Sequence, residues 1–160
     1  MIEVAEIFVW SGKAYLPVLG KTEVSFFWQA GPLLTTELAV DALTVALQEI
    51  VRTGNPPIPH PTQAEFNRST PVQKAIGMRS WRKMAEVGVL RCGIWWLEDK
   101  ILVAFTPRLA KDVNEIDIEN QRYFPLDTPM RTIAEEIVRE IQARQEEKPR
   151  GNAEGSFSVS

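Results

Sequence analysis

The chain has 160 residues, of which 44% are hydrophobic and 24% are charged. This length and this balance are typical of one globular domain that buries a core of its own. The net charge of −3 argues against a surface that binds nucleic acid along its whole extent, although it leaves room for a local basic patch.

The cysteine content and the lengths of the apolar runs limit which cellular compartment the protein can occupy and which covalent or metal-binding chemistry it can use. Cys92 is the only cysteine, so neither an internal disulfide nor a cluster of cysteine ligands can form. No apolar run reaches the ~20 residues that a membrane-spanning helix requires. The first ten residues lack the basic region of a secretory signal. We therefore expect a cytoplasmic protein.

Strand-forming composition occurs in two blocks. The first block comprises residues 2–10, 14–19 and 24–29, which are separated by glycine-containing turns. The second block comprises residues 89–97 and 101–105, joined by a short polar turn. Each block is expected to form antiparallel strands.

Two segments carry hydrophobic residues at helical spacing. The first begins near Thr36, where Thr35 or Thr36 can cap a helix, and ends at Gly54. The second opens at Thr128-Pro129, and its apolar stripe extends from Met130 to Ile141. We predict a helix in each segment.

Residues 54–66, GNPPIPHPTQAEF, contain four of the eleven prolines and His60, the only histidine. Proline fixes φ and extends the residue before it, so this segment is predicted to be a semi-rigid connector. A general base needs a reactive partner within hydrogen-bonding distance, and the neighbours of His60 are prolines. We interpret the segment as a connector rather than a reactive site.

Three capping signals follow the connector. Thr62 and Thr70 each begin a capping box, which ends at Glu65 and at Gln73, and Ser80 can cap a third short helix. These signals predict short helices between the two strand blocks.

The order of strands, helices, strands and helix predicts an α+β fold with one antiparallel sheet built from both blocks and helices packed on one face. Residues 1–146 are expected to form a single domain. Residues 147–160 lack any periodicity, which predicts a disordered C-terminal tail.

An acidic row is predicted on the alternating segment 114–120, where Glu115, Asp117 and Glu119 share one strand face. These carboxylates could deter edge pairing, bind a hard cation or dock a basic protein. Trp95 and Trp96 point to opposite sides of one strand, so at least one is a candidate interface anchor. We take these five residues as the candidate partner-binding set and expect no metal.

Residues 68–91 hold six basic side chains against the single acid Glu86. Basic side chains that surround a tryptophan can follow a phosphate backbone and stack on bases. They could equally be the outer faces of helices. The alternative nucleic-acid patch consists of Arg79, Trp81, Arg82 and Lys83.

No pattern predicts an enzyme. Cys92 has no histidine near it in sequence, and no serine-hydrolase, phosphate-loop or dinucleotide motif occurs. Glu98-Asp99-Lys100 resembles the metal site of restriction-endonuclease-like nucleases, but that site needs an upstream aspartate at the end of a strand. The only upstream aspartate, Asp41, lies in a predicted helix. We expect no catalysis and no cofactor.

The succession of GNPPIPHPTQAEF, SWRKMAEVGVLRCGIWWLEDK and TPMRTIAEEIVREI resembles the layout of small bacterial immunity proteins that neutralise toxin domains, including those of contact-dependent inhibition systems. The likeness covers residues 10–145. It implies an intracellular protein that binds one cognate toxin, often a basic nuclease. The favoured hypothesis is therefore a non-catalytic protein-binding module, and the alternative is a nucleic-acid-associated protein.

Overall fold

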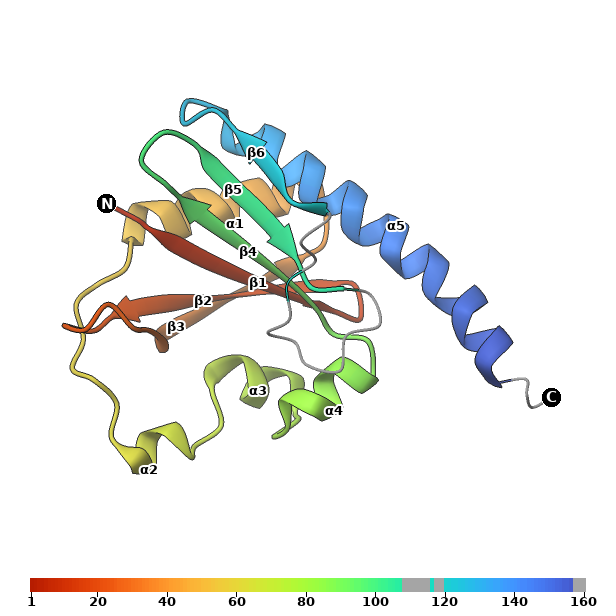
Figure 1. Ribbon diagram of the computed structural model, residues 1–160, viewed down its shortest axis with the longest axis horizontal. Helices are drawn as coiled ribbons and strands as arrows, with labels where there is room; N and C mark the ends of the chain where they lie inside the picture. The colour runs from red at the N-terminus through yellow and green to blue at the C-terminus, as the bar shows by residue number, and fades with distance from the viewer. Residues whose placement is uncertain (108–115, 117–119, 157–160) are drawn as a thin grey trace.

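The computed structural model describes residues 1–107, 116 and 120–156, with side chains up to residue 146. The fold is α+β, as predicted (Figure 1). One antiparallel sheet has the strand order β3-β2-β1-β4-β5-β6. Its strands are β1 (Val4–Trp10), β2 (Lys13–Lys21), β3 (Phe27–Glu37), β4 (Leu90–Trp96), β5 (Ile101–Phe105) and β6 (Arg122–Phe124).

Both predicted strand blocks belong to this sheet because β1 pairs with β2 on one side and with β4 on the other. The helices are α1 (Val40–Thr53), α2 (Gln63–Phe66), α3 (Pro71–Ile76), α4 (Trp81–Glu86) and α5 (Met130–Ser156). None of the helices in the described ranges is both long enough and apolar enough to cross a membrane.

The first face of the sheet is covered by α1 and α5. Alternate residues of β1, among them Ile7 and Val9, point to this face because side chains alternate along a strand. They pack against Leu47 of α1 and against Ile133 and Ile137 of α5, which are all fully buried. The two apolar stripes read from the sequence are thus the inner faces of these two helices.

The second face carries a smaller core, so the expectation that the helices lie on one face is wrong in this respect. Phe8 and Tyr15 form a buried cluster with Val72 and Ile76 of α3 and with Met84 of α4. The capping signals of α3 and α4 predict where these helices begin, but they carry no information on the face that each helix covers.

The proline-rich connector takes the chain from α1 on the first face to α3 and α4 on the second. It passes the ends of β1 and β2, where Lys21 N donates to Pro56 O at 2.9 Å and Ile58 N donates to Lys21 O at 3.0 Å. The side chain of Asn55 accepts from Glu3 N and donates to the carbonyl oxygens of Val4 and Leu19. The connector is therefore fixed to the sheet.

The caps agree with the sequence at three helices and differ at one. Thr62 and Thr70 form complete capping boxes, and the hydroxyl of Ser80 accepts from Lys83 N. Helix α1 begins later than predicted, after Ala39, without a side-chain cap. Thr35 and Thr36 cannot cap it because they extend β3 and pair with Tyr15 and Ala14 of β2.

The C-terminal part contains a helix that is longer than the predicted apolar stripe and a short strand that the sequence did not predict. Helix α5 extends to Ser156 and projects past the sheet in Figure 1, so the predicted tail over 147–160 begins inside this helix. The last buried position of α5 within the described side chains is Arg144. The strand predicted over 114–120 lies almost wholly outside the described residues, whereas the short strand β6 was not predicted.

Ile137 tests the packing of α5 on the first face. Its side chain is fully buried, so Ile137→Ala should lower the free energy of unfolding by about 2–5 kcal/mol through lost burial and a residual cavity. Gln142→Ala, at an exposed position of the same helix, is the control and should change it by less than about 0.5 kcal/mol. Chemical denaturation measures both changes in the free energy of unfolding. Equal values for the two substitutions would contradict this packing.

Candidate protein-binding face

The second face of the sheet carries a row of large side chains at its β4–β5–β6 end. Trp95 pairs with Leu102, and Leu102 pairs with Tyr123. Directly paired residues of antiparallel strands point to the same face, so the three side chains lie next to one another across three strands. We call Trp95, Leu102 and Tyr123 the cross-strand row.

Trp95 lies over a glycine. A Cβ added at Gly93 would lie 2.4 Å from Cη2 of the indole, so the ring covers the bare backbone of its own strand. Trp95 is half-buried, and so is Leu102 beside it. The glycine thus allows a large aromatic side chain to lie flat on the sheet.

Trp96 has a different role. Its side chain points to the first face and packs against the core formed with α1 and α5. The two tryptophans therefore point to opposite faces, as the sequence predicted, and Trp95 belongs to the candidate surface. Trp96 is partly buried against this core, so we leave it out of the candidate surface, and its predicted role in partner binding stays a prediction.

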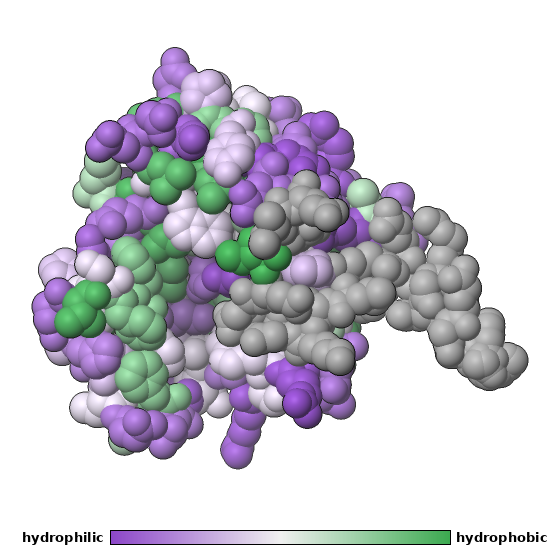
Figure 2. All heavy atoms as spheres, viewed as in Figure 1, coloured by the Kyte–Doolittle hydropathy of each residue, from purple (hydrophilic) through white to green (hydrophobic). Residues whose placement is uncertain are grey.

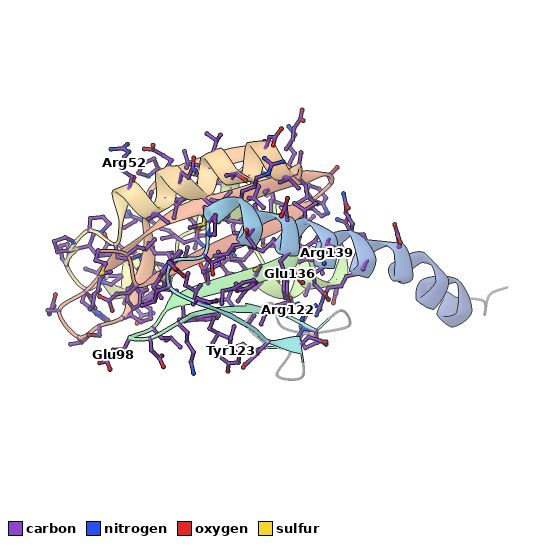
Figure 3. The ribbon with its side chains drawn as sticks, turned by 90° about the horizontal axis from the view of Figure 1, so that it is seen from above. Arg52, Glu98, Arg122, Tyr123, Glu136 and Arg139 are labelled. Carbon is purple, nitrogen blue, oxygen red and sulfur yellow. The ribbon has the colours of Figure 1, made fainter. Side chains whose placement is uncertain are left out.

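Tyr123 is the most exposed member of the row, with 56% of the residue's surface accessible. The ammonium group of Lys100 lies 5.0 Å from the ring centroid, and the hydroxyl of Tyr123 donates to Oε1 of Gln121 at 3.0 Å. Glu98 and Asp99 are exposed in the β4–β5 turn, which Leu97 N closes by donating to Lys100 O. Figure 3 shows Glu98 and Tyr123 on the side of the sheet away from α1 and α5.

The orientation of Tyr123 is set by its neighbour on the other face. The guanidinium of Arg122 donates to Glu136 of α5 at 2.8 Å (Figure 3). It also donates to Glu140 of the same helix at 2.5 Å. These charge-assisted bonds are half-buried and fix β6 to α5. Because side chains alternate along a strand, Tyr123 then points away from α5.

An ion pair separates the cross-strand row from the smaller core. Arg91 Nη2 donates to Glu6 Oε2 at 2.6 Å across β1 and β4, and the two side chains are only 12% and 17% accessible. Each charge compensates the other where water is scarce, so the pair leaves little net charge on this part of the face.

The remaining residues of the two predicted sets have different outcomes. Glu115, Asp117 and Glu119 lie outside the described residues, so the acidic row stays a prediction. Of the predicted basic patch, Arg79 and Trp81 line a separate hollow, whereas Arg82 and Lys83 are exposed on α4 and do not line it.

The candidate nucleophile and the histidine lie apart from this face. Burial raises the pKa of the Cys92 thiol well above its ordinary value, and the charges of Arg91 and Arg144 offset only part of that effect. His60 belongs to a cluster of aromatic rings. The centroid of its imidazole lies 5.6 Å from that of the Phe26 ring and 5.7 Å from that of the Phe66 ring. Within the described ranges, no three His, Cys, Asp or Glu side chains gather as they would around a metal ion.

Leu102 and Tyr123 were missed by the sequence prediction. The run ILVAF identifies a buried strand without showing which of its residues face outward. Strand β6 has only three residues, too few for an alternating pattern. The row depends on the register between strands, which no local signal provides.

No protein-family model and no curated protein matches the chain. A solved structure, a protein of unknown function from Neisseria meningitidis, is similar, with a TM-score of 0.57 and 7% sequence identity. The match covers 82% of this chain and 88% of that one. At this identity the likeness shows a shared fold alone.

The ring cluster around His60 leads to a stability prediction. His60→Ala should change the free energy of unfolding by no more than about 0.5 kcal/mol, because the side chain is exposed and Phe26 and Phe66 remain 5.7 Å apart without it. Phe66→Ala, which removes the ring that contacts Phe26, Trp28 and His60, should cost more in the same urea titration. The reverse order of effects would contradict the connector interpretation.

Proposed function

We propose that the protein is a non-catalytic protein-binding module whose partner docks on the cross-strand row and on the adjacent β4–β5 turn. The observation that carries this proposal is the aromatic and aliphatic row on the part of the second face beside the helix-covered core. Tyrosine and tryptophan combine a large apolar area with a polar group, and they are frequent anchors of protein interfaces.

The setting of the row favours a preformed interface. The three side chains project from hydrogen-bonded strands, and β6 is fixed to α5 by Arg122. Binding therefore costs little ordering of the backbone. Glu98 and Asp99 lie beside the row, in the β4–β5 turn, and favour a partner with basic side chains around an apolar centre, since complementary charges accelerate encounter.

The layout shared with immunity proteins suggests the kind of partner. A toxin domain that acts on nucleic acid carries a basic surface, and an acidic, aromatic face on its inhibitor would cover that surface. We therefore propose that this chain neutralises a cognate bacterial toxin domain inside the cell. The predicted acidic row at Glu115, Asp117 and Glu119 would add to the same charge complementarity.

The direct test is binding to the protein encoded by the gene next to this one, measured by surface plasmon resonance. Tyr123→Ala should raise Kd by about tenfold or more, as expected for an anchor residue. Reversal of both Glu98 and Asp99 to lysine should mainly lower the association rate and weaken its dependence on salt. A separate reversal of Glu115, Asp117 and Glu119 to lysine tests the predicted acidic row.

Gly93→Ala offers a sharper variant because it keeps every side chain of the row. The added methyl group would force the indole of Trp95 off the strand, so binding should weaken while the partner's other contacts remain. Glu49→Lys on α1, which lies on the first face, is the charge-changing control and should leave Kd unchanged. Tight binding by all row variants, with loss of binding in the α1 control, would contradict the proposed face.

A further inference from the structure

The hollow that Arg79 and Trp81 line lies on the same side of the sheet as the cross-strand row, between the start of β3 and the short helices α2, α3 and α4. It has a volume of about 810 Å³ and opens to solvent. Its charged lining residues are Arg68, Lys74 and Arg79, and no acidic side chain lines it. Three positive charges therefore surround one depression in a chain whose net charge is −3.

The walls of this hollow are held by one buried glutamine. Gln73 Oε1 accepts from Thr70 N at 2.8 Å, and its Nε2 donates to Arg79 O at 2.7 Å. The first bond fixes the start of α3, and the second fixes the loop that precedes α4. Val72 N also donates to Gln29 Oε1 at 3.2 Å, which ties α3 to β3 next to Trp28.

Two indole rings line the hollow, and each is supported by phenylalanine. Trp81 stacks on Phe8 of the sheet, with ring centroids 5.7 Å apart and planes inclined by 29°. Trp28 lies 4.9 Å from Phe66, which it meets edge to face, and 5.9 Å from Phe26. In Figure 2, hydrophobic residues gather over the β2–β3 turn and the region towards α2, with hydrophilic residues around them.

The basic side chains of the hollow are available to a ligand. Within the part of the chain that the structure describes, neither Lys74 nor Arg79 forms an ion pair, and both are exposed. Arg68 is also exposed and lies close enough to Glu65 for its charge to act on that carboxylate. The backbone carbonyl of Arg79 serves the fold, whereas its side chain and that of Lys74 have no hydrogen-bond or ion-pair partner within the described ranges.

We infer that this hollow binds a short single-stranded nucleic acid, with phosphates on Arg68, Lys74 and Arg79 and bases against Trp28 and Trp81. Cations that follow the backbone, together with aromatic planes for the bases, are the two features of single-strand sites. An acidic peptide would use the cations but would leave the indoles without flat partners. A duplex hides the faces of its bases, so it could not use the indoles either.

This site differs from the basic patch expected from the sequence. Arg79 and Trp81 belong to it, while Arg68, Lys74 and Trp28 replace Arg82 and Lys83. It also differs from the cross-strand row, so the two proposals can fail independently.

The test is fluorescence anisotropy with a labelled oligothymidine of about ten nucleotides, a length within the range of known single-strand sites. Three phosphate contacts predict a slope of about −2 in a plot of log K against log salt concentration. Intrinsic tryptophan fluorescence should be quenched on binding. An abasic strand of the same length and charge should bind more weakly and quench less.

Variants locate the site. The double variant Lys74→Glu and Arg79→Glu should weaken binding of the oligothymidine by about tenfold or more, because it removes two of three phosphate contacts. Arg52→Glu, an exposed charge reversal on α1, is the control and should leave the affinity within about twofold. Thermal melts establish that all variants are folded.

Four results would each overturn the inference. These are equal binding of the abasic strand, tighter binding of polyglutamate than of oligothymidine, full affinity in the Lys74 and Arg79 double variant, and no binding at low salt. Polyglutamate preference would assign the hollow to an acidic protein segment instead.

Discussion

The pairing of β1 with β4 is the constraint on which the rest of this structure depends. It joins strands about ninety positions apart in sequence and makes one sheet of two blocks that could otherwise have remained separate. Residues of β1 are buried on both faces, with Ile7 and Val9 on one and Phe8 on the other. The Arg91–Glu6 ion pair spans the same two strands and favours their register, since each charge would be costly here without the other.

The two faces of the sheet are used differently because of how the chain returns to β4. Helices α1 and α5 complete the large core, whereas the connector leads to α3 and α4, which cover the β1–β2–β3 side of the second face. This arrangement places the cross-strand row beside the part of the second face that α3 and α4 cover. It also creates the hollow between β3 and α3, because short helices cannot fill the space that a long helix would. Both proposed binding surfaces thus exist because the short helices cover only part of the second face.

The features that could be predicted from the sequence are local. The apolar stripe of α5 and the capping boxes at Thr62 and Thr70 depend on residues a few positions apart, and each appears where it was expected. The features that could not be predicted depend on distant pairing. Thr36 carries a cap signal, yet it belongs to β3 because β2 lies beside it, and Tyr123 reaches the candidate face only through the register of β5 with β6.

The central claim is that the β4–β5–β6 end of the second face binds a partner protein. Hydrogen–deuterium exchange on the complex with the protein encoded by the neighbouring gene tests this claim most directly. Exchange is expected to slow at residues 97–100 and 121–126 on binding and to stay unchanged over α1. Protection confined to α1 and the outer surface of α5, with no change at the β4–β5 turn or β6, would contradict it.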